Sequence, residues 1–182
     1  MARCTLLVYA ASCVLLACGS DTGGPLEDDD IPDIAYCDSV ANWDSAWTEF
    51  ENDVFVIVNQ RRSEGADCGS EGTFSSASPL QTDGGLHCAA RLHSKDMADR
   101  GFWDHTNPDN EEPWDRMDRA GYQWSRAAEN IARGSTTPEA VMQGWMNSDG
   151  HCANIMNPQL VHIGIGYHGA SQHWTQVFGA PR

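Results

Sequence analysis

The side chains best suited to acid–base or metal chemistry in this chain are its histidines, of which there are seven. No short motif around them assigns a reaction, because the sequence has no glycine-rich phosphate loop, no His-Glu-x-x-His and no Gly-x-Ser-x-Gly elbow. Ser148 and His151, three residues apart across a glycine, are the best-spaced pair for a nucleophile and its base. The other candidates are His105, within FWDHTNP at 102–108, and His173, which opens the run HWTQV.

Apolar periodicity predicts two helices, and start and stop signals predict two more, that would position these residues. The first runs from about residue 43 to about Arg62 and ends at Gly65, and the second runs from Leu86 to near Gly101 and turns His93 inward. A short third helix lies between Pro113 and Gly121, and TTPE at 136–139 caps the start of a fourth. The buried face of the fourth helix is predicted to be Val141, Met142, Trp145 and Met146.

Three segments are predicted to be strands. One is short, from Ala128 to Ala132, and two late runs, 161–167 and 172–178, alternate well enough to form a hairpin joined by 168–171. Helices before and between strands, with an antiparallel hairpin at the end, favour an α/β sandwich over a doubly wound parallel sheet.

The first 36 residues predict export and a lipid anchor. Residues 1–17 have a positive start and an apolar stretch, and with Cys18 they end in LLAC, the pattern of a lipoprotein signal peptide. The apolar stretch, about fourteen residues, is shorter than the roughly 20 that a spanning helix needs. We expect a lipid on Cys18, so that the protein contacts a membrane through it, while Cys4 and Cys13 leave with the signal peptide. Residues 18–36 are predicted to be a flexible acidic linker, and residues 37–182 one domain.

Composition limits the partners of that domain. The chain has 26 acidic and 11 basic side chains, a balance that disfavours nucleic-acid binding and repels anionic lipid head groups. We expect a soluble, monomeric domain.

The residue after Cys18 predicts which membrane holds the anchor. Gly19, rather than an aspartate, follows the lipidated cysteine. We therefore expect outer-membrane placement if the source has two membranes, with the domain facing the periplasm or the cell surface.

Four cysteines remain beyond the linker, namely Cys37, Cys68, Cys88 and Cys152. An even number in an oxidising compartment predicts two disulfides. No two of them lie within four residues of one another, which excludes the paired knuckles of a structural zinc site. The residues alone leave all three connectivities open.

Over nearly the whole predicted domain, the sequence resembles the CAP superfamily of cysteine-rich secretory and pathogenesis-related proteins, in its bacterial form. The matching segments are HSxxM at 93–97, 101–108, 116–122, ENIAxG at 129–134, WxxSxGH at 145–151, NIM at 154–156 and 173–179. The resemblance implies a three-layer alpha-beta-alpha sandwich with a mainly antiparallel central sheet and a central cleft. It also favours the disulfide Cys68–Cys152, which leaves Cys37–Cys88, with Cys68–Cys88 as the alternative pairing.

The resemblance also implies a metal site. In the family, two histidines and two glutamates converge in the cleft and can hold a divalent ion; carried over by motif, the ligands here are His105, Glu129 and His173. Two imidazoles and one carboxylate suit zinc or another divalent metal. The alternative is that the two histidines hydrogen-bond Glu129 and nearby backbone, with no metal.

The position of the second glutamate is held by Ser148, three residues after the tryptophan of the fourth helix. The ligand set is therefore incomplete: either Asp149 or His151 supplies the missing group, or the three residues hold a metal together with a water. We expect His93 to pack in the core, and the remaining histidines, His87, His162 and His168, have no assigned role.

Two functions from different classes are compatible with these features. The first, which we favour, is an extracytoplasmic binding module whose cleft takes a lipid, sterol, glycan or protein ligand. The second is a metal-assisted hydrolase of the peptidase or esterase type at the cell envelope, with His105, Glu129 and His173 as its catalytic group or, less favoured, Ser148 and His151.

Overall fold

The computed structural model describes residues 31–182, so the predicted signal peptide, the predicted lipid on Cys18 and most of the predicted linker lie outside the described residues. In chain order the described elements are η2 (Asp38–Val40), α1 (Ser45–Glu64), β1 (Ala66–Asp67), η3 (Gly69–Glu71), β2 (Thr73–Phe74), β3 (Gln81–Thr82), α2 (Gly84–Arg100), α3 (Pro113–Arg119), β4 (Trp124–Arg133), α4 (Pro138–Met146), α5 (Asp149–Met156), β5 (His162–His168) and β6 (His173–Pro181). Within residues 31–182, no helix combines the length and the apolar character needed to span a bilayer.

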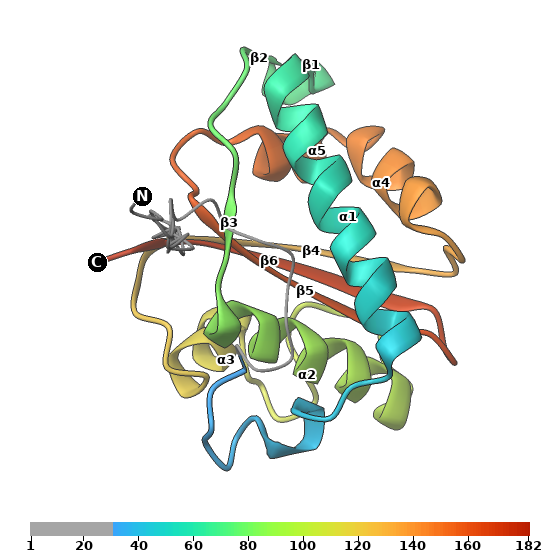
Figure 1. Cartoon of the computed structure of the whole chain (residues 1–182). Helices are drawn as coiled ribbons and strands as arrows, with labels where there is room; N and C mark the ends of the chain where they lie inside the picture. The colour runs from blue at the N-terminus through green and yellow to red at the C-terminus, as the bar shows by residue number, and fades with distance from the viewer. Residues whose placement is uncertain (1–30) are drawn as a thin grey trace, which may run out of the picture.

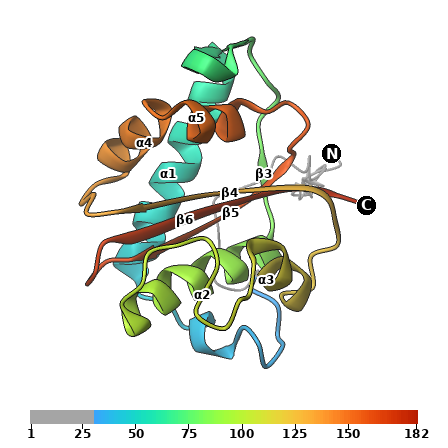
Figure 2. The same ribbon diagram turned by 180° about the vertical axis from the view of Figure 1, so that it is seen from behind.

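The elements form three layers around a four-stranded sheet of order β3-β5-β6-β4. Strands β5, β6 and β4 pair antiparallel, and the short β3 runs parallel to β5. Helices α1, α4 and α5 cover one face of the sheet and α2 and α3 cover the other (Figure 1), an arrangement that is equally plain from behind (Figure 2). The expected three-layer sandwich with a mainly antiparallel sheet is confirmed.

Helix boundaries agree with the local signals in the sequence. Asp44 caps α1 by accepting from the backbone N–H of Ala46 at 2.9 Å, and Thr137 caps α4 by accepting from Ala140 at 3.2 Å. Helix α2 ends at Gly101, whose left-handed backbone (φ 69°) favours a residue without a Cβ. These ends were predictable because capping chemistry involves residues close in sequence.

Two glycines bring α2 unusually close to the sheet. Gly164 and Gly166 on β5 face the helix backbone, and a Cβ at either position would collide with main-chain atoms of α2. The helix therefore lies directly on the strand. On the opposite face, the largest core cluster packs α1, α4 and α5 onto the sheet around the fully buried Trp145 and Trp174.

Both disulfides form as the resemblance implied. Cys37–Cys88 ties the segment before α1 to α2, and Cys68–Cys152 ties the loop after α1 to α5. The alternative pairing of Cys68 with Cys88 is therefore wrong. Each crosslink closes a long loop and is expected to stabilise the fold by a few kcal/mol.

Three sequence predictions need correction. Strand β4 runs from Trp124 to Arg133 rather than from Ala128 to Ala132, because its first half gains its conformation by pairing with β6 rather than from its own alternation. Helix α5 was missed: with eight residues it is too short for a periodic pattern. The ordered fold also begins before the predicted boundary at Cys37, since Ile31 is buried and packs with Cys37 and its neighbours.

Candidate functional site

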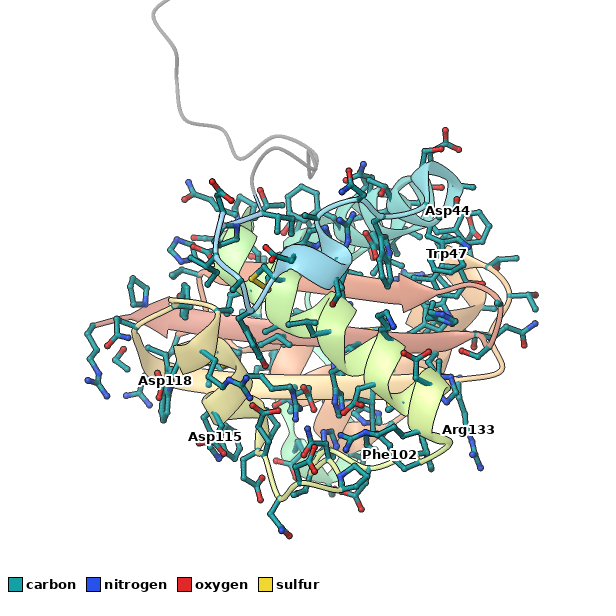
Figure 3. The ribbon with its side chains drawn as sticks, turned by 90° about the horizontal axis from the view of Figure 1, so that it is seen from below. Asp44, Trp47, Phe102, Asp115, Asp118 and Arg133 are labelled. Atoms are coloured by element: carbon teal, nitrogen blue, oxygen red, sulfur yellow. A yellow bond between two sulfur atoms is a disulfide. The ribbon has the colours of Figure 1, made fainter. Side chains whose placement is uncertain are left out.

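The loop between α2 and α3 carries His105 to the edge of the sheet. The side-chain oxygen of Asn107 accepts from the backbone N–H groups of Asp109 and Glu111, each at 3.0 Å, which fixes the turn after the histidine. Arg116 on α3 donates from Nη2 to the carbonyl of His105 at 2.9 Å. Figure 3 shows this side of the molecule, with Phe102 at the start of the loop, near the end of α2, and Asp115 on α3 beyond it. The loop is therefore held at both ends.

Glu129, on β4, is the carboxylate that meets this loop. Its side chain is 2% exposed and accepts two hydrogen bonds, from His105 Nδ1 at 2.8 Å and from Arg116 Nη2 at 2.9 Å. An ionised carboxylate can only accept, so His105 Nδ1 carries the proton in this bond. The other ring nitrogen, Nε2, is left for a ligand or substrate, and the His105 side chain is 45% exposed.

The charges in this cluster reinforce one another. Burial by itself raises the pKa of the Glu129 carboxyl, but the hydrogen bond from His105 and the charge and hydrogen bond of Arg116 act against burial, and the pKa is lowered. The hydrogen bond to Glu129 raises the pKa of His105 in turn. Glu129 therefore stays ionised and holds the imidazole in one orientation, as carboxylates do behind functional histidines.

His93 supports this cluster from inside the core. It is fully buried, its Nε2 lies 3.0 Å from the carbonyl oxygen of Asp104, and burial lowers its pKa to about 4. The ring is therefore neutral and donates Nε2–H to that carbonyl. The prediction that His93 is a packed core histidine is confirmed.

Two cavities open on either side of His105. One, of about 220 Å³, is lined by Trp103 and His151 as well as His105. The other, of about 370 Å³, is lined by Trp114 and the start of α3. Trp103 and Trp114 are 48% and 39% exposed, so each cavity presents an aromatic surface beside the imidazole. Both cavities are also lined by residues of β4, and the two together are here called the His105 groove.

The pair Ser148 and His151 is not assembled as a dyad. Ser148 stands at the N-terminal cap of α5, and no hydrogen bond joins it to His151. His151 instead faces the cavity it shares with His105, where burial and then the charge of His105 lower its pKa. Asp149 accepts from the backbone and the hydroxyl of Ser70 and so secures the disulfide-bonded loop rather than the groove.

Comparison with known proteins agrees with this fold. The family model described as CAP, the cysteine-rich secretory protein family, matches residues 57–178. This chain belongs to the CAP family. The expectation drawn from the sequence resemblance is thereby confirmed.

Two curated proteins of Bacillus subtilis (strain 168) are similar to part of this chain. The chain is 47% identical over 100 residues to the uncharacterized protein YkwD, an overlap of 55% of this chain and 39% of that protein. It is 30% identical over 86 residues to the uncharacterized membrane protein YlbC, covering 47% of this chain and 24% of that protein. The chain thus spans less than half the length of either relative.

Solved structures contain the same fold. An extracellular protein with an SCP domain from Bacillus anthracis (strain Ames) has a TM-score of 0.64 at 30% identity, covering 72% of this chain and 40% of that one. An outer surface protein of Borrelia burgdorferi has a TM-score of 0.61 at 17% identity, covering 71% of this chain and 90% of that one. At that identity the second likeness shows the fold alone.

The structure brings together only part of the ligand set carried over from the CAP resemblance. His105 and Glu129 meet, but both carboxylate oxygens of Glu129 are occupied by hydrogen bonds. His173 pairs with Arg133 at the far end of β4, four residues beyond Glu129, which is roughly 13 Å along a strand. Among residues 31–182, no three His, Cys, Asp or Glu side chains are grouped to hold a metal. These three residues as they lie do not fit a shared ion, and metal uptake by the protein stays a prediction.

Sequence reasoning missed three residues of the His105 groove. Arg116 was placed in a matching segment without a role, although its guanidinium joins His105 to Glu129. Trp103 and Trp114 carried no signal, because an exposed tryptophan cannot be told from a buried one by its position in the chain. The helix-starting Pro113 beside Trp114 was the nearest available hint.

Proposed function

We propose that this CAP-domain protein is exported and acts outside the cytoplasm as a binding module, with the His105 groove as its ligand site. The observation that carries the proposal is a half-exposed imidazole, held by a buried carboxylate and arginine, between two cavities that each contain an exposed tryptophan. Exposed aromatic surface beside a fixed polar group is typical of ligand sites.

Export is supported by two independent features. The two disulfides of the domain persist in oxidising compartments, and the solved Bacillus anthracis neighbour, 30% identical, is described as an extracellular protein. The lipid on Cys18 is the finer part of this proposal. Growth with a labelled fatty acid should label the protein, and Cys18→Ala should abolish the label and move the protein from the membrane fraction to the soluble fraction. Unlabelled protein with Cys18 intact would overturn the anchor and leave export standing.

Ligand binding in the His105 groove can be followed through its tryptophans. We suggest titrating the full chain with cholesterol, phosphatidylcholine vesicles, soluble cell-wall glycan fragments and an unstructured peptide library, while recording tryptophan fluorescence. The probe that binds should lose affinity in Trp103→Ala, Trp114→Ala and His105→Ala. Val56→Ala, which removes an exposed apolar side chain of α1 away from the groove, is the matched control. Binding that is equal in all four variants would place the site elsewhere.

A hydrolase is the second candidate, and one observation favours it. Glu129 binds His105 through Nδ1 and so leaves Nε2 unprotonated in a residue that lines both cavities, which suits a general base that activates water. Turnover of ester or peptide substrates should then fall by about 100-fold or more in His105→Ala, the usual worth of a positioned base. Turnover that survives this change would remove the candidate.

A further inference from the structure

A second group of polar side chains lies at the tip of the β5–β6 hairpin, apart from the His105 groove. His168 ends β5, His173 begins β6, and the two residues pair directly across the strands. Ser171 lies in the loop between them. Its Oγ is 2.8 Å from His168 Nδ1 and 2.8 Å from His173 Nδ1, so that two imidazole nitrogens converge on one atom.

The hydroxyl cannot satisfy both rings in the same way. A serine hydroxyl has one proton, so it can donate to only one of the two nitrogens, and the other ring must turn its own N–H toward the oxygen. A cation at this point would instead be met by an imidazole lone pair from each strand. The geometry therefore resembles a pair of ligands drawn together by a hydroxyl in place of a metal.

We propose that His168 and His173 form a two-histidine clip for a divalent transition-metal ion at the hairpin tip, with the Ser171 hydroxyl or water completing its coordination. Directly opposite residues of an antiparallel pair hold their side chains on the same face, about 5 Å apart at Cβ. Small rotations of the two rings would bring both nitrogens to the roughly 2.0 to 2.1 Å that a metal–imidazole bond requires.

The donor set decides which ions fit. Imidazole nitrogens suit Zn²⁺, Ni²⁺ and Cu²⁺, whereas Mg²⁺ and Ca²⁺ require oxygen ligands. The rings must be neutral to coordinate, and burial lowers the pKa of both, with the neighbouring charge of His168 lowering that of His173 further. Of the charged groups facing the tip, Lys95 is paired with Asp99, and Arg133 lies over Trp103.

Packing orients one of the two rings in advance. Trp47 lies against His168 with ring centroids 4.7 Å apart, and Gly169 leaves room for that indole, since a Cβ there would overlap it. Trp43 is a further neighbour of His168, at 6.3 Å between centroids. A clip held by such packing loses little side-chain entropy on binding. Both indoles also lie close enough to report a paramagnetic ion by quenching.

The test is a titration of the full chain with Ni²⁺ near neutral pH, followed by tryptophan fluorescence. We expect saturable quenching that Zn²⁺ displaces and Mg²⁺ does not. The double variant His168→Gln/His173→Gln should bind at least about tenfold more weakly, the smallest loss usual even for residues that only support a metal ligand. His162→Gln is the matched control, because it removes an imidazole from the other end of β5 and should leave the affinity unchanged.

Two further measurements distinguish this site from the His105 groove and guard against misfolding of the double variant. His105→Gln separates this site from the His105 groove: unchanged affinity supports the clip, and lost affinity would assign the ion to the groove and overturn it. Should the double variant fold poorly, histidine ring NMR signals of the unmodified chain serve instead, since Ni²⁺ should broaden those of His168 and His173 first. Earlier broadening of other histidines, equal displacement by Mg²⁺, or the absence of saturable quenching would each refute the proposal.

Discussion

Glu51 and Glu129 are both buried, both pair with an arginine, and both lie near a histidine, yet they belong to opposite kinds of site. Glu51, on α1, is fully buried and accepts from Arg91 Nε and Nη2 at 3.0 and 2.8 Å. It also accepts from the backbone N–H of Tyr167 at 2.8 Å and from the indole of Trp43 at 3.0 Å. Its carboxylate is enclosed by protein donors.

The histidines make the difference plain. His87 Nε2 is 3.4 Å from Glu51, and neither side chain has any exposed surface. His105, by contrast, is hydrogen-bonded to Glu129 at 2.8 Å, and its side chain is 45% exposed. The same three residue types therefore tie α1 to α2 around Glu51 but present an oriented imidazole to solvent around Glu129. Solvent access to the histidine, rather than residue composition, separates the structural cluster from the functional one.

The two carboxylates also differ in proton affinity. Burial raises the pKa of Glu51 to about 7 in spite of the opposing charge of Arg91. The pKa of Glu129 is lowered, because the interactions with His105 and Arg116 act against its burial. Four changes can break or sharpen this comparison.

The largest loss is expected from Glu51→Ala. It leaves Arg91 fully buried without its carboxylate, which should lower the free energy of unfolding by about 3 to 5 kcal/mol, measured by urea denaturation. Glu51→Met combined with Arg91→Met removes both charges and should cost less than the single change. If the free energy of unfolding of Glu51→Ala lay within about 1 kcal/mol of that of the unmodified chain, the network around Glu51 would not be structural.

Glu129→Gln should have a smaller effect on stability. Arg116 loses a charged acceptor but keeps the carbonyls of Glu111 and His105, so we expect a loss of about 1.5 to 3 kcal/mol in the same measurement. The pKa of His105, followed by NMR, should fall at the same time, because the group that raises it is gone. An unchanged pKa for His105 would mean that Glu129 does not orient it.

The His105–Glu129 pair should make stability depend on pH within a defined window. Glu129, with its lowered pKa, contributes above its ordinary value of 4.5 and loses that contribution as the pH falls. His105, with its raised pKa, contributes fully below 6.5 and loses that contribution as the pH rises through its folded value. The difference in unfolding free energy between the unmodified chain and His105→Gln should therefore be largest between pH 4.5 and 6.5; a difference that is constant across pH would contradict this.

The smallest effect on stability is expected from His105→Ala at about pH 9, where the free energy of unfolding should change by no more than about 0.5 kcal/mol, as at other exposed positions. Glu129 keeps Arg116 as its partner, and water can reach the oxygen that His105 releases. His87→Ala, measured in parallel, removes a fully buried ring and should cost several times more. Equal losses of unfolding free energy in the two variants would contradict the distinction between the buried Glu51 cluster and the solvent-accessible Glu129 cluster.

Much of the fold could be predicted because its signals are local. The cap at the start of α4, the glycine that ends α2 and the final hairpin all depend on residues near one another in sequence. The elements that escaped prediction depend on distant partners or are too short for periodicity. The first half of β4 is a strand because β6 lies beside it, and α5 spans only eight residues.

The sequence by itself determined the helix and strand types, the even set of cysteines and, through its CAP motifs, the family, because these follow from local chemistry and ordered matching segments. Only the tertiary structure decided which chemical groups meet. It joins His105 to Glu129 and Arg116, and it sends His173 to His168 instead. The physical reason is strand register. His173 pairs with Arg133 across the sheet, and Arg133 is four residues along β4 from Glu129, which puts His173 beyond the reach of the Glu129 side chain.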